Sequence, residues 1–170
     1  VSRINPYLVD APNIALEKRT NSISRAPRIN YGSMALDDGH LLLSSAERLA
    51  LLTECPEAAP FVRPFVGGEE FLNGGQRFCL WLRASPPTLL RNCATIREKV
   101  EATRVYRQSS GRETTQKLAA FPGLFGENRQ PDTSFLLLPK VSSESRMFMP
   151  IGFMAADIVA SGSALIVPSA

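Results

Sequence analysis

Apolar positions are sparse and irregular over residues 1–40, where Pro6, Pro12 and Pro27 interrupt the chain. The segment Y-G-S-M-A-L-D-D-G-H at 31–40 is typical of turns, because Gly and Asp tolerate left-handed and Asx-type geometry. We therefore predict that residues 1–40 form an irregular strap over a core built elsewhere.

Helical periodicity begins at Ser44. The run S-S-A-E-R-L-A-L-L-T-E-C places Leu49 and Leu52 on an apolar stripe, and Ser44 with Glu47 has the spacing of a capping box. Pro56 should end this helix.

The next segments alternate between strand and helix. The apolar run Phe78–Leu82 follows N-G-G, which predicts a hairpin leading into a buried strand. The longest predicted helix starts near Ser85, with Pro86 and Pro87 in its first turn. Its apolar stripe is Leu89, Cys93, Ile96, Val100 and Thr103. A shorter helix over 113–121 should stop near Pro122.

Strand patterns dominate the last part of the chain. Residues 133–140 and 146–154 should pair around the turn V-S-S-E-S, and A-L-I-V-P at 164–168 is a further strand. We predict a single α+β domain in which helices and antiparallel hairpins are irregularly interleaved. The sequence opens without Met and stops soon after a strand, so we expect a domain truncated at both ends.

Composition supports a packed domain. Of the 170 residues, 44% are apolar and 21% are charged, which is enough apolar material for a core. The net charge of +3 and the pI near 9.0 are compatible with an anionic partner without requiring one. No apolar run approaches the roughly 18 residues of a membrane span, so we expect no membrane partner.

Cys55, Cys79 and Cys93 lack the spacing of a metal site or a disulfide framework. We expect reduced, buried thiols, no metal, and a cytoplasmic protein.

Three motifs suggest catalysis but fall short of it. I-N-P-Y-L lacks the second proline of the Asn-Pro-Pro-Tyr motif with which amino-methyltransferases hold a flipped base. V-G-G-E-E-F-L-N-G-G-Q matches no phosphate-binding glycine pattern, and no G-x-S-x-G elbow accompanies His40 and its neighbouring aspartates. We expect no catalytic residue in this chain.

Basic and hydroxyl side chains gather at the end of the long helix and in the loop after it. Arg97 with Glu101 makes an ordinary i,i+4 pair, but the segment Y-R-Q-S-S-G-R offers a set suited to phosphate oxygens. The candidate contacts to a nucleic-acid backbone are Arg104, Arg107, Ser109, Ser110, Arg112 and Lys117.

Several blocks occur in an order and spacing that resemble the target-recognition region of MmeI-type restriction–modification proteins. They include G-G-E-E-F-L-N-G-G-Q-R-F-C-L-W-L and P-K-V-S-S-E-S-R-M-F-M-P-I-G-F, and the resemblance spans essentially the whole chain. In that family one polypeptide carries an endonuclease, an S-adenosylmethionine-dependent adenine-N6 methyltransferase and a target-recognition domain.

The resemblance implies that residues 1–170 are a fragment of a domain that recognises double-stranded DNA. Residues 1–40 would then be a strap or linker from a preceding methyltransferase domain, with an endonuclease domain as a further candidate partner. It implies base readout by Glu144 and Arg146, and a backbone contact by Lys140. In an extended strand these two residues would project from one face. S-adenosylmethionine would be a cofactor of the parent enzyme and not of this chain.

Two other readings stay open from the residues alone. One is a small self-sufficient hydrolase using His40, and the other is a protein-interaction module without a DNA role. For Glu144 and Arg146 the alternative to base readout is a mutual surface ion pair.

Overall fold

The structure is a computed structural model that describes residues 4–8, 10–12, 18 and 27–168. Its helices are α1 (Ser45–Glu54), η1 (Pro56–Phe61), α2 (Gly68–Asn73), α3 (Pro87–Asn92), α4 (Ala94–Gln108), α5 (Glu113–Lys117) and η2 (Leu118–Ala120). Its strands are β1 (Asn30–Tyr31), β2 (Leu42–Leu43), β3 (Val62–Val66), β4 (Phe78–Leu80), β5 (Phe135–Pro139), β6 (Gly152–Met154), β7 (Val159–Ala160) and β8 (Ala164–Pro168). Residues 1–3, 9, 13–17 and 19–26 of the expected strap lie outside the described residues.

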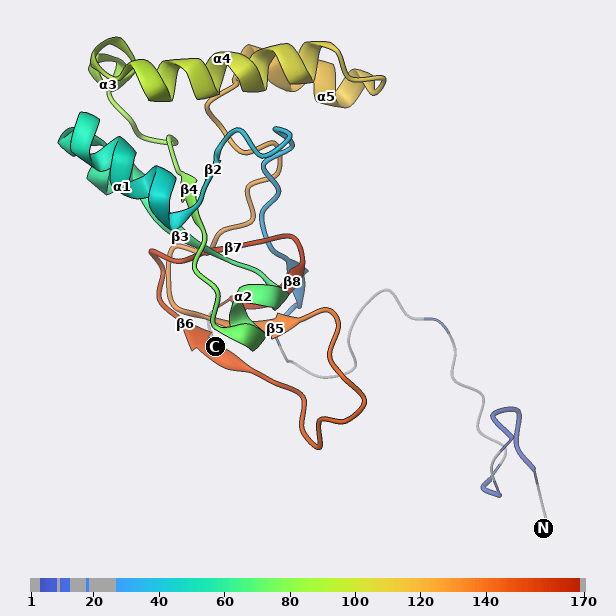
Figure 1. Ribbon diagram of the computed structural model, residues 1–170. Coiled ribbons are helices and arrows are strands. Elements are labelled where there is room, and N and C mark those ends of the chain that lie inside the picture. The colour runs from blue at the N-terminus through green and yellow to red at the C-terminus, as the bar shows by residue number, and fades with distance from the viewer. Residues whose placement is uncertain (1–3, 9, 13–17, 19–26, 169–170) are drawn as a thin grey trace.

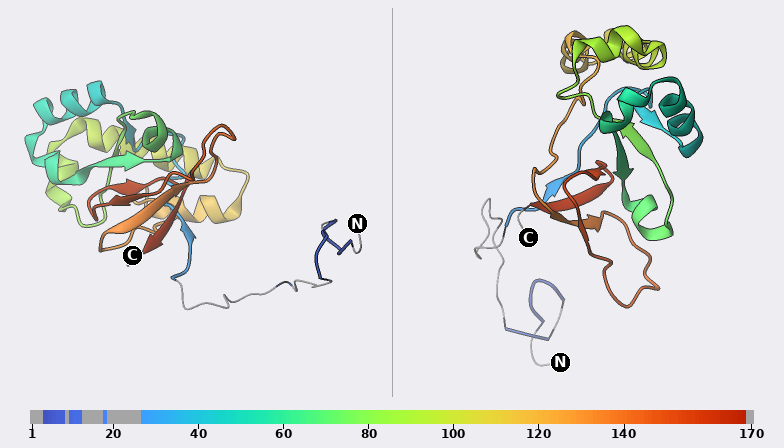
Figure 2. Two further views of the ribbon diagram at one scale, coloured as in Figure 1. Left: turned by 90° about the horizontal axis from the view of Figure 1, so that it is seen from below. Right: turned by 90° about the vertical axis from the view of Figure 1, so that its left-hand side faces the viewer.

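Two four-stranded sheets organise the fold. One has the strand order β1-β8-β5-β6 and the other β2-β4-β3-β7, and all pairs are antiparallel except β3 with β7. Helices α3, α4 and α5 gather at one end, while the loop between β5 and β6 projects from the other (Figure 1). The side view in Figure 2 keeps this arrangement. The prediction of an α+β domain with irregular interleaving is confirmed.

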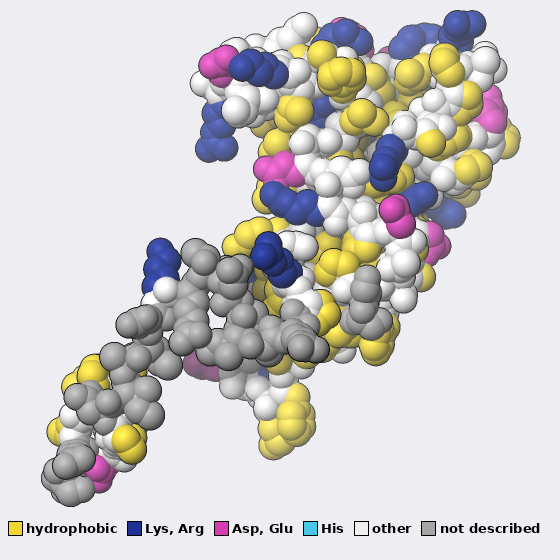
Figure 3. Space-filling model, turned by 180° about the vertical axis from the view of Figure 1, so that it is seen from behind, with side chains coloured by type: hydrophobic (Ala, Val, Ile, Leu, Met, Phe, Trp, Pro, Cys, Tyr) yellow, Lys and Arg dark blue, Asp and Glu magenta, His cyan; other side chains and the backbone are white. Residues whose placement is uncertain are grey.

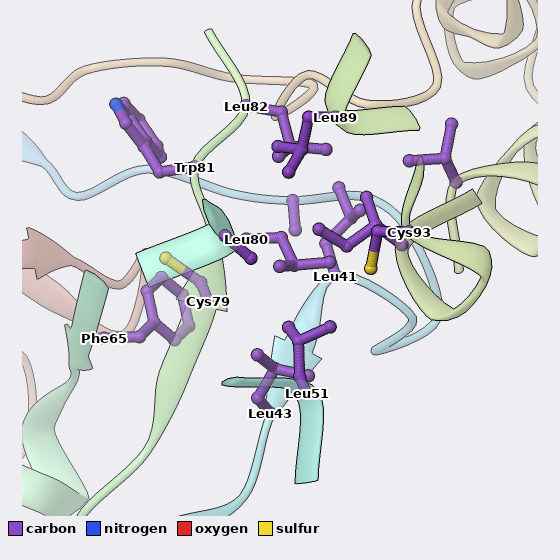
Figure 4. Packing of buried hydrophobic residues seen from close by; sticks show 14 of the residues in the cluster. Leu41, Leu43, Leu51, Phe65, Cys79, Leu80, Trp81, Leu82, Leu89 and Cys93 are labelled. Atoms are coloured by element: carbon purple, nitrogen blue, oxygen red, sulfur yellow. The ribbon is translucent and has the colours of Figure 1, made fainter. Parts of the chain in front are cut away.

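The larger core lies between the helices and the β2-β4-β3 strands. Leu41, Leu43, Leu51 and Leu80 are almost fully buried there, and Figure 4 shows them converging with residues of α3 and β3. Each such side chain contributes about 1.5–3 kcal/mol on burial. The Phe125 ring packs edge-on against Trp81, with the ring centroids 5.0 Å apart.

A smaller core belongs to the other sheet. Phe135 and Leu137 of β5 are buried with Ile166 of β8, while the intervening residues of β5 are only half-buried. This alternation has the period of a strand with one covered face.

Helix α1 begins as predicted. The Glu47 amide donates to Ser44 Oγ at 3.2 Å and the Ser44 amide donates to Glu47 Oε2 at 2.9 Å, which completes the capping box. The predicted long helix is instead two helices, because Cys93 adopts an extended conformation between α3 and α4. The apolar stripe predicted for it is buried throughout.

The N-G-G segment does not form the predicted hairpin turn. It ends helix α2, with Gly74 in the left-handed C-cap conformation at φ 75°. Strands β3 and β4 are nonetheless antiparallel neighbours, joined through α2 rather than through a tight turn.

The pairing of the two predicted strands around V-S-S-E-S is confirmed, but its extent is not. Strand β5 pairs with β6 from Phe135 opposite Met154 to Leu137 opposite Gly152, and β6 begins only at Gly152. The side chains of residues 141–149 are all exposed. With no face covered, this stretch lacks the packing that would hold it as a strand.

The three cysteines are free and buried. Burial raises the pKa of the Cys79 thiol to about 12, and burial followed by contact with Cys93 raises the pKa of Cys55. Such thiols are poor nucleophiles at neutral pH, so we assign them to packing. Among the described residues no helix is long and apolar enough to cross a membrane.

Candidate nucleic-acid interface

The β5–β6 loop, residues 140–151, carries the two predicted base-reading residues. A turn joins Ser143 to Arg146, whose amide donates to the Ser143 carbonyl at 3.1 Å. The hydroxyls of Ser143 and Ser145 lie 2.7 Å apart and brace this turn. Glu144 and Arg146 therefore lie at a turn, and the expectation that they share one face of an extended strand is wrong.

The side chains of Glu144 and Arg146 at this turn are exposed and unpaired in the described part of the chain. In the described part of the chain no salt bridge or hydrogen bond links the Glu144 carboxylate or the Arg146 guanidinium to another side chain. The alternative of a mutual ion pair is thus not the arrangement seen. The two side chains are available to an outside partner that offers both donors and acceptors.

The second half of the same loop is apolar and equally exposed. Met147 is 87% exposed, Phe148 80% and Met149 66%, and Phe153 on the edge strand β6 is 70% exposed. Figure 3 shows a hydrophobic lobe where this loop projects below the body of the molecule. A contiguous exposed apolar patch of this kind is typical of an interaction surface.

Lys140 stands at the start of the loop, next to an aromatic ring. Its Nζ lies 4.2 Å from the centre of the Tyr31 ring, and the guanidinium of Arg129 lies 6.0 Å from the same centre. Sequence reasoning missed Tyr31 and Arg129, because the pairing of β1 with β8 brings them to Lys140 and no local pattern indicates it.

The other predicted backbone contacts lie at the helical end. Arg104 pairs with Glu101 at 3.0 Å and Lys117 pairs with Glu113 at 2.8 Å, both within one turn of helix. Ser109 Oγ donates to the Tyr106 carbonyl, while Ser110 Oγ accepts from the Arg112 amide, so both hydroxyls brace the chain after α4. Of this set, the exposed Arg112 guanidinium alone has no partner among the described residues.

The prediction that Arg107 contacts the DNA backbone is wrong. Its side chain is fully buried, and its guanidinium donates to five backbone carbonyls. The acceptors are Leu36 and Ala35 before α1, and Leu118, Phe121 and Leu124 after α5, at 2.7–3.1 Å. A guanidinium with its donors used inside the fold cannot reach a DNA phosphate.

The candidate residues thus separate into two groups. Helices α4 and α5 lie at one end of the molecule and the β5–β6 loop at the other (Figures 1 and 2). Only Lys140 lies in the same loop as Glu144 and Arg146.

The hydrolase reading finds no support in the region of His40. The Asp37 carboxylate is buried and accepts from the amides of Gly39 and Leu41, which closes its own turn. No side-chain hydrogen bond joins it to His40 in the described part of the chain. Nor do three His, Cys, Asp or Glu side chains gather there as a metal site would require.

A cleft of about 630 Å³ is lined by side chains of both charges. Its lining includes the basic residues Arg63 and Arg83, the Trp81 ring, and the acidic residues Asp132 and Asp157. Gln130 also lines this cleft. Its side-chain amide donates to the carbonyls of Ala156 and Ile158, and its side-chain oxygen accepts from the Ala160 amide. The mixed charges do not single out an anionic ligand.

Comparison with known proteins agrees with the interface reading. The family model described as "MmeI, target recognition domain" matches residues 10–170. "DNA methyltransferase A" of Bacillus subtilis (strain 168) is 35% identical over 161 residues, which covers 95% of this chain and 18% of that protein.

A solved structure is similar over nearly the whole chain. It is described as "Structure of Type IIL restriction-modification enzyme MmeI in complex with DNA has implications for engineering of new specificities". It superposes with a TM-score of 0.89 at 36% identity, over 99% of this chain and 23% of that one. The present chain therefore spans about a fifth of the length of these relatives.

Proposed function

Since the chain belongs to the MmeI target recognition domain family, we propose that it selects the target site in double-stranded DNA for a longer methyltransferase polypeptide. The observation that carries the proposal is the β5–β6 loop, where Glu144 and Arg146 are exposed and unengaged. The match to a chain solved in complex with DNA supports the same reading.

Glu144 and Arg146 have the chemistry to read one base pair. A carboxylate accepts from cytosine N4, and a guanidinium donates two bonds to guanine O6 and N7, each contact discriminating by about 1–3 kcal/mol. Together they select one C·G pair in one orientation. The turn at 143–146 takes the place of the strand in presenting both side chains outward.

Backbone contacts hold such a loop in register. Lys140 is the first of these, because it begins the same loop. Arg112 with its neighbours Arg104, Ser109, Ser110 and Lys117 forms a second set that would meet the backbone elsewhere. Arg107 is left out because it is buried.

The parent polypeptide would supply the chemistry. We assign to it the transfer of a methyl group from S-adenosylmethionine to adenine N6, with or without a fused endonuclease, in the cytoplasm. The cofactor belongs in parts outside this chain, because the present sequence contains neither G-x-G-x-x-G nor Asn-Pro-Pro-Tyr.

The test exchanges the two charges in the parent enzyme. Glu144→Lys combined with Arg146→Asp should reverse the selected pair from C·G to G·C and leave the other positions of the site unchanged. Either single substitution should abolish most methylation, because one charge would then face the wrong base edge. The measurement is the set of sites methylated in genomic DNA.

A matched control exchanges two exposed neighbouring charges on α4. Arg97→Glu with Glu98→Arg preserves the net charge and should leave the methylated sites unaltered. If the double variant at 144 and 146 methylates the original sites, this loop does not read the base pair.

A further inference from the structure

Tyr31 is the centre of a cationic group at the start of the β5–β6 loop. The ring is 52% exposed, with Lys140 Nζ 4.2 Å and the Arg129 guanidinium 6.0 Å from its centre. Aromatic faces attract cations through the ring quadrupole, by about 0.5–1 kcal/mol at exposed sites. One ring thus gathers two like charges that would otherwise repel each other.

The sheet fixes the positions of all three residues. Tyr31 pairs with Leu165 of β8, which in turn pairs with Leu138 of β5, so β1 and the end of β5 flank the same strand. The Arg129 amide donates to Ser33 Oγ at 3.0 Å and its Nη1 donates to the Gly32 carbonyl at 3.2 Å. The group is therefore anchored to the sheet and not to the exposed tip of the loop.

The two cations differ in how they are neutralised. Arg129 pairs with Glu127, whereas Lys140 forms no salt bridge with a carboxylate in the described part of the chain. By contrast Lys99, Arg104 and Lys117 at the helical end all have carboxylate partners. Of these cations, the Lys140 ammonium is therefore the best placed to bind an anion from a partner molecule.

The loop also has the reach that a phosphate contact requires. From Lys140 to Glu144 an extended chain spans at most about 14 Å. The major groove of B-DNA is about 8.5 Å deep. A cation held at the lip of the groove is therefore compatible with charged side chains at its floor.

We propose that Tyr31 is a positioning residue, whose ring holds the Lys140 ammonium against one phosphodiester of the DNA backbone beside the β5–β6 loop. The proposal rests on the proposed function, since it needs duplex DNA as the partner. The contact is with the backbone, so it fixes the register of the loop and carries no base preference.

The test measures DNA binding by the parent enzyme at several salt concentrations, on duplexes with and without its target site. Tyr31→Leu removes the aromatic face, and Tyr31→Phe keeps it. Losing one phosphate contact should flatten the salt slope by about one unit. The affinity ratio between 50 and 200 mM salt should then shrink about fourfold.

We expect Tyr31→Leu and Lys140→Gln to flatten the slope equally, on both duplexes, and their combination to do no more than Lys140→Gln alone. Tyr31→Phe should bind like the unaltered enzyme. Tyr106→Leu, a comparable change on α4, is the control and should leave the slope unchanged.

Two results would overturn the proposal. If Lys140→Gln leaves the slope unchanged, the ammonium does not touch a phosphate, and this holds even if Tyr31→Leu fails to fold. If Tyr31→Leu and Lys140→Gln have additive effects, the ring does not act through the lysine.

These results are separable from those that test base readout. A flattened slope with unaltered site preference in the variant exchanged at 144 and 146 would sustain the phosphate contact and refute the base contact. An unchanged slope in the Tyr31 and Lys140 variants, with a reversed base pair in the variant exchanged at 144 and 146, would refute the phosphate contact and sustain the base contact.

Discussion

At the scale of single residues, Arg107 combines complete burial of its side chain with five hydrogen bonds to the backbone. Its five donors tie the segment before α1 to the segment after α5, across the last turns of α4. Burial lowers the pKa of this guanidinium, and the nearby charge of Asp37 opposes that shift. A lysine offers only three donors from a single point and cannot reproduce this fork.

Arg107→Lys should therefore destabilise the domain by about 3–5 kcal/mol, since buried carbonyls and a buried charge lose their partners. Arg104→Lys is the matched control, because it changes a partly exposed arginine with one pair on its own helix, and should cost less than about 0.5 kcal/mol. Denaturant unfolding of both variants measures the difference. Equal stabilities would show that the five bonds contribute little.

At the scale of elements, the start of α1 couples helix capping to pH. Hydrogen bonds from the Ser44 amide and hydroxyl, followed by Lys99, lower the pKa of Glu47 from 4.5 to about 2. A carboxyl whose pKa is lower in the folded state stabilises the fold above pH 4.5. That contribution is lost as pH falls from 4.5 towards 2.

Glu47→Gln should lower the free energy of unfolding by about 0.5–1 kcal/mol at pH 7, near the low end for a cap, because the side chain is half exposed. The deficit relative to the unaltered protein should shrink as the pH is lowered through this window. Unfolding curves at pH 7 and near pH 3 test it, and a deficit that does not change with pH would contradict the assignment.

The β5–β6 loop is accessible to an external probe. Trypsin should cut the parent enzyme after Arg146, because residues 141–149 are exposed. Target DNA should protect this bond, while a duplex without the site protects it less. Cleavage at the same rate with and without DNA would place the loop away from the duplex.

The elements that could be predicted from the sequence are those set by residues close to one another in the chain. The capping box of α1 and the buried stripe of α4 were predictable, since both are set by spacing within one helix. The same stripe, continued from Thr103 by one turn, reaches Arg107 and indicates its burial. The basic residues around Arg107 indicate a phosphate contact instead, and that indication is wrong.

The contacts made by tertiary pairing were not predictable. Tyr31 reaches Lys140 only because β8 lies between β1 and β5, and no local pattern shows that order. The turn that carries Glu144 was predictable from the V-S-S-E-S segment, but the strand predicted from Arg146 begins only at Gly152, because nothing covers the apolar residues 147–149. They are exposed, and the strand pattern there reflects a surface and not a core.

At the scale of the whole molecule, the charges are too dispersed for tight binding by this chain alone. The helical end and the β5–β6 loop lie at opposite ends of the molecule and would meet DNA at different places (Figure 1).

The isolated chain should bind DNA with little sequence preference, at about 10⁻⁴ to 10⁻⁶ M at physiological salt. Arg112→Ala should weaken this binding alike on all sequences. Fluorescence anisotropy with two unrelated duplexes measures both effects. A strong preference for one duplex would mean that this chain suffices for recognition.

The isolated chain should also give no heat with S-adenosylmethionine in calorimetry, because the segments assigned to the cofactor lie outside it. A clear binding isotherm would contradict that assignment.

The central position of β8 has a consequence for how the polypeptide is made. At about 5–20 residues per second, a ribosome needs roughly 2–7 seconds to pass from Phe135 to Pro168. Until then β1 and β5 have no common neighbour, and Phe135 and Leu137 cannot complete their core. The nascent chain therefore presents apolar surface for that time, which makes it a client for chaperones. Substitutions that slow the docking of β8 should lower the yield of soluble protein even where the finished domain is equally stable.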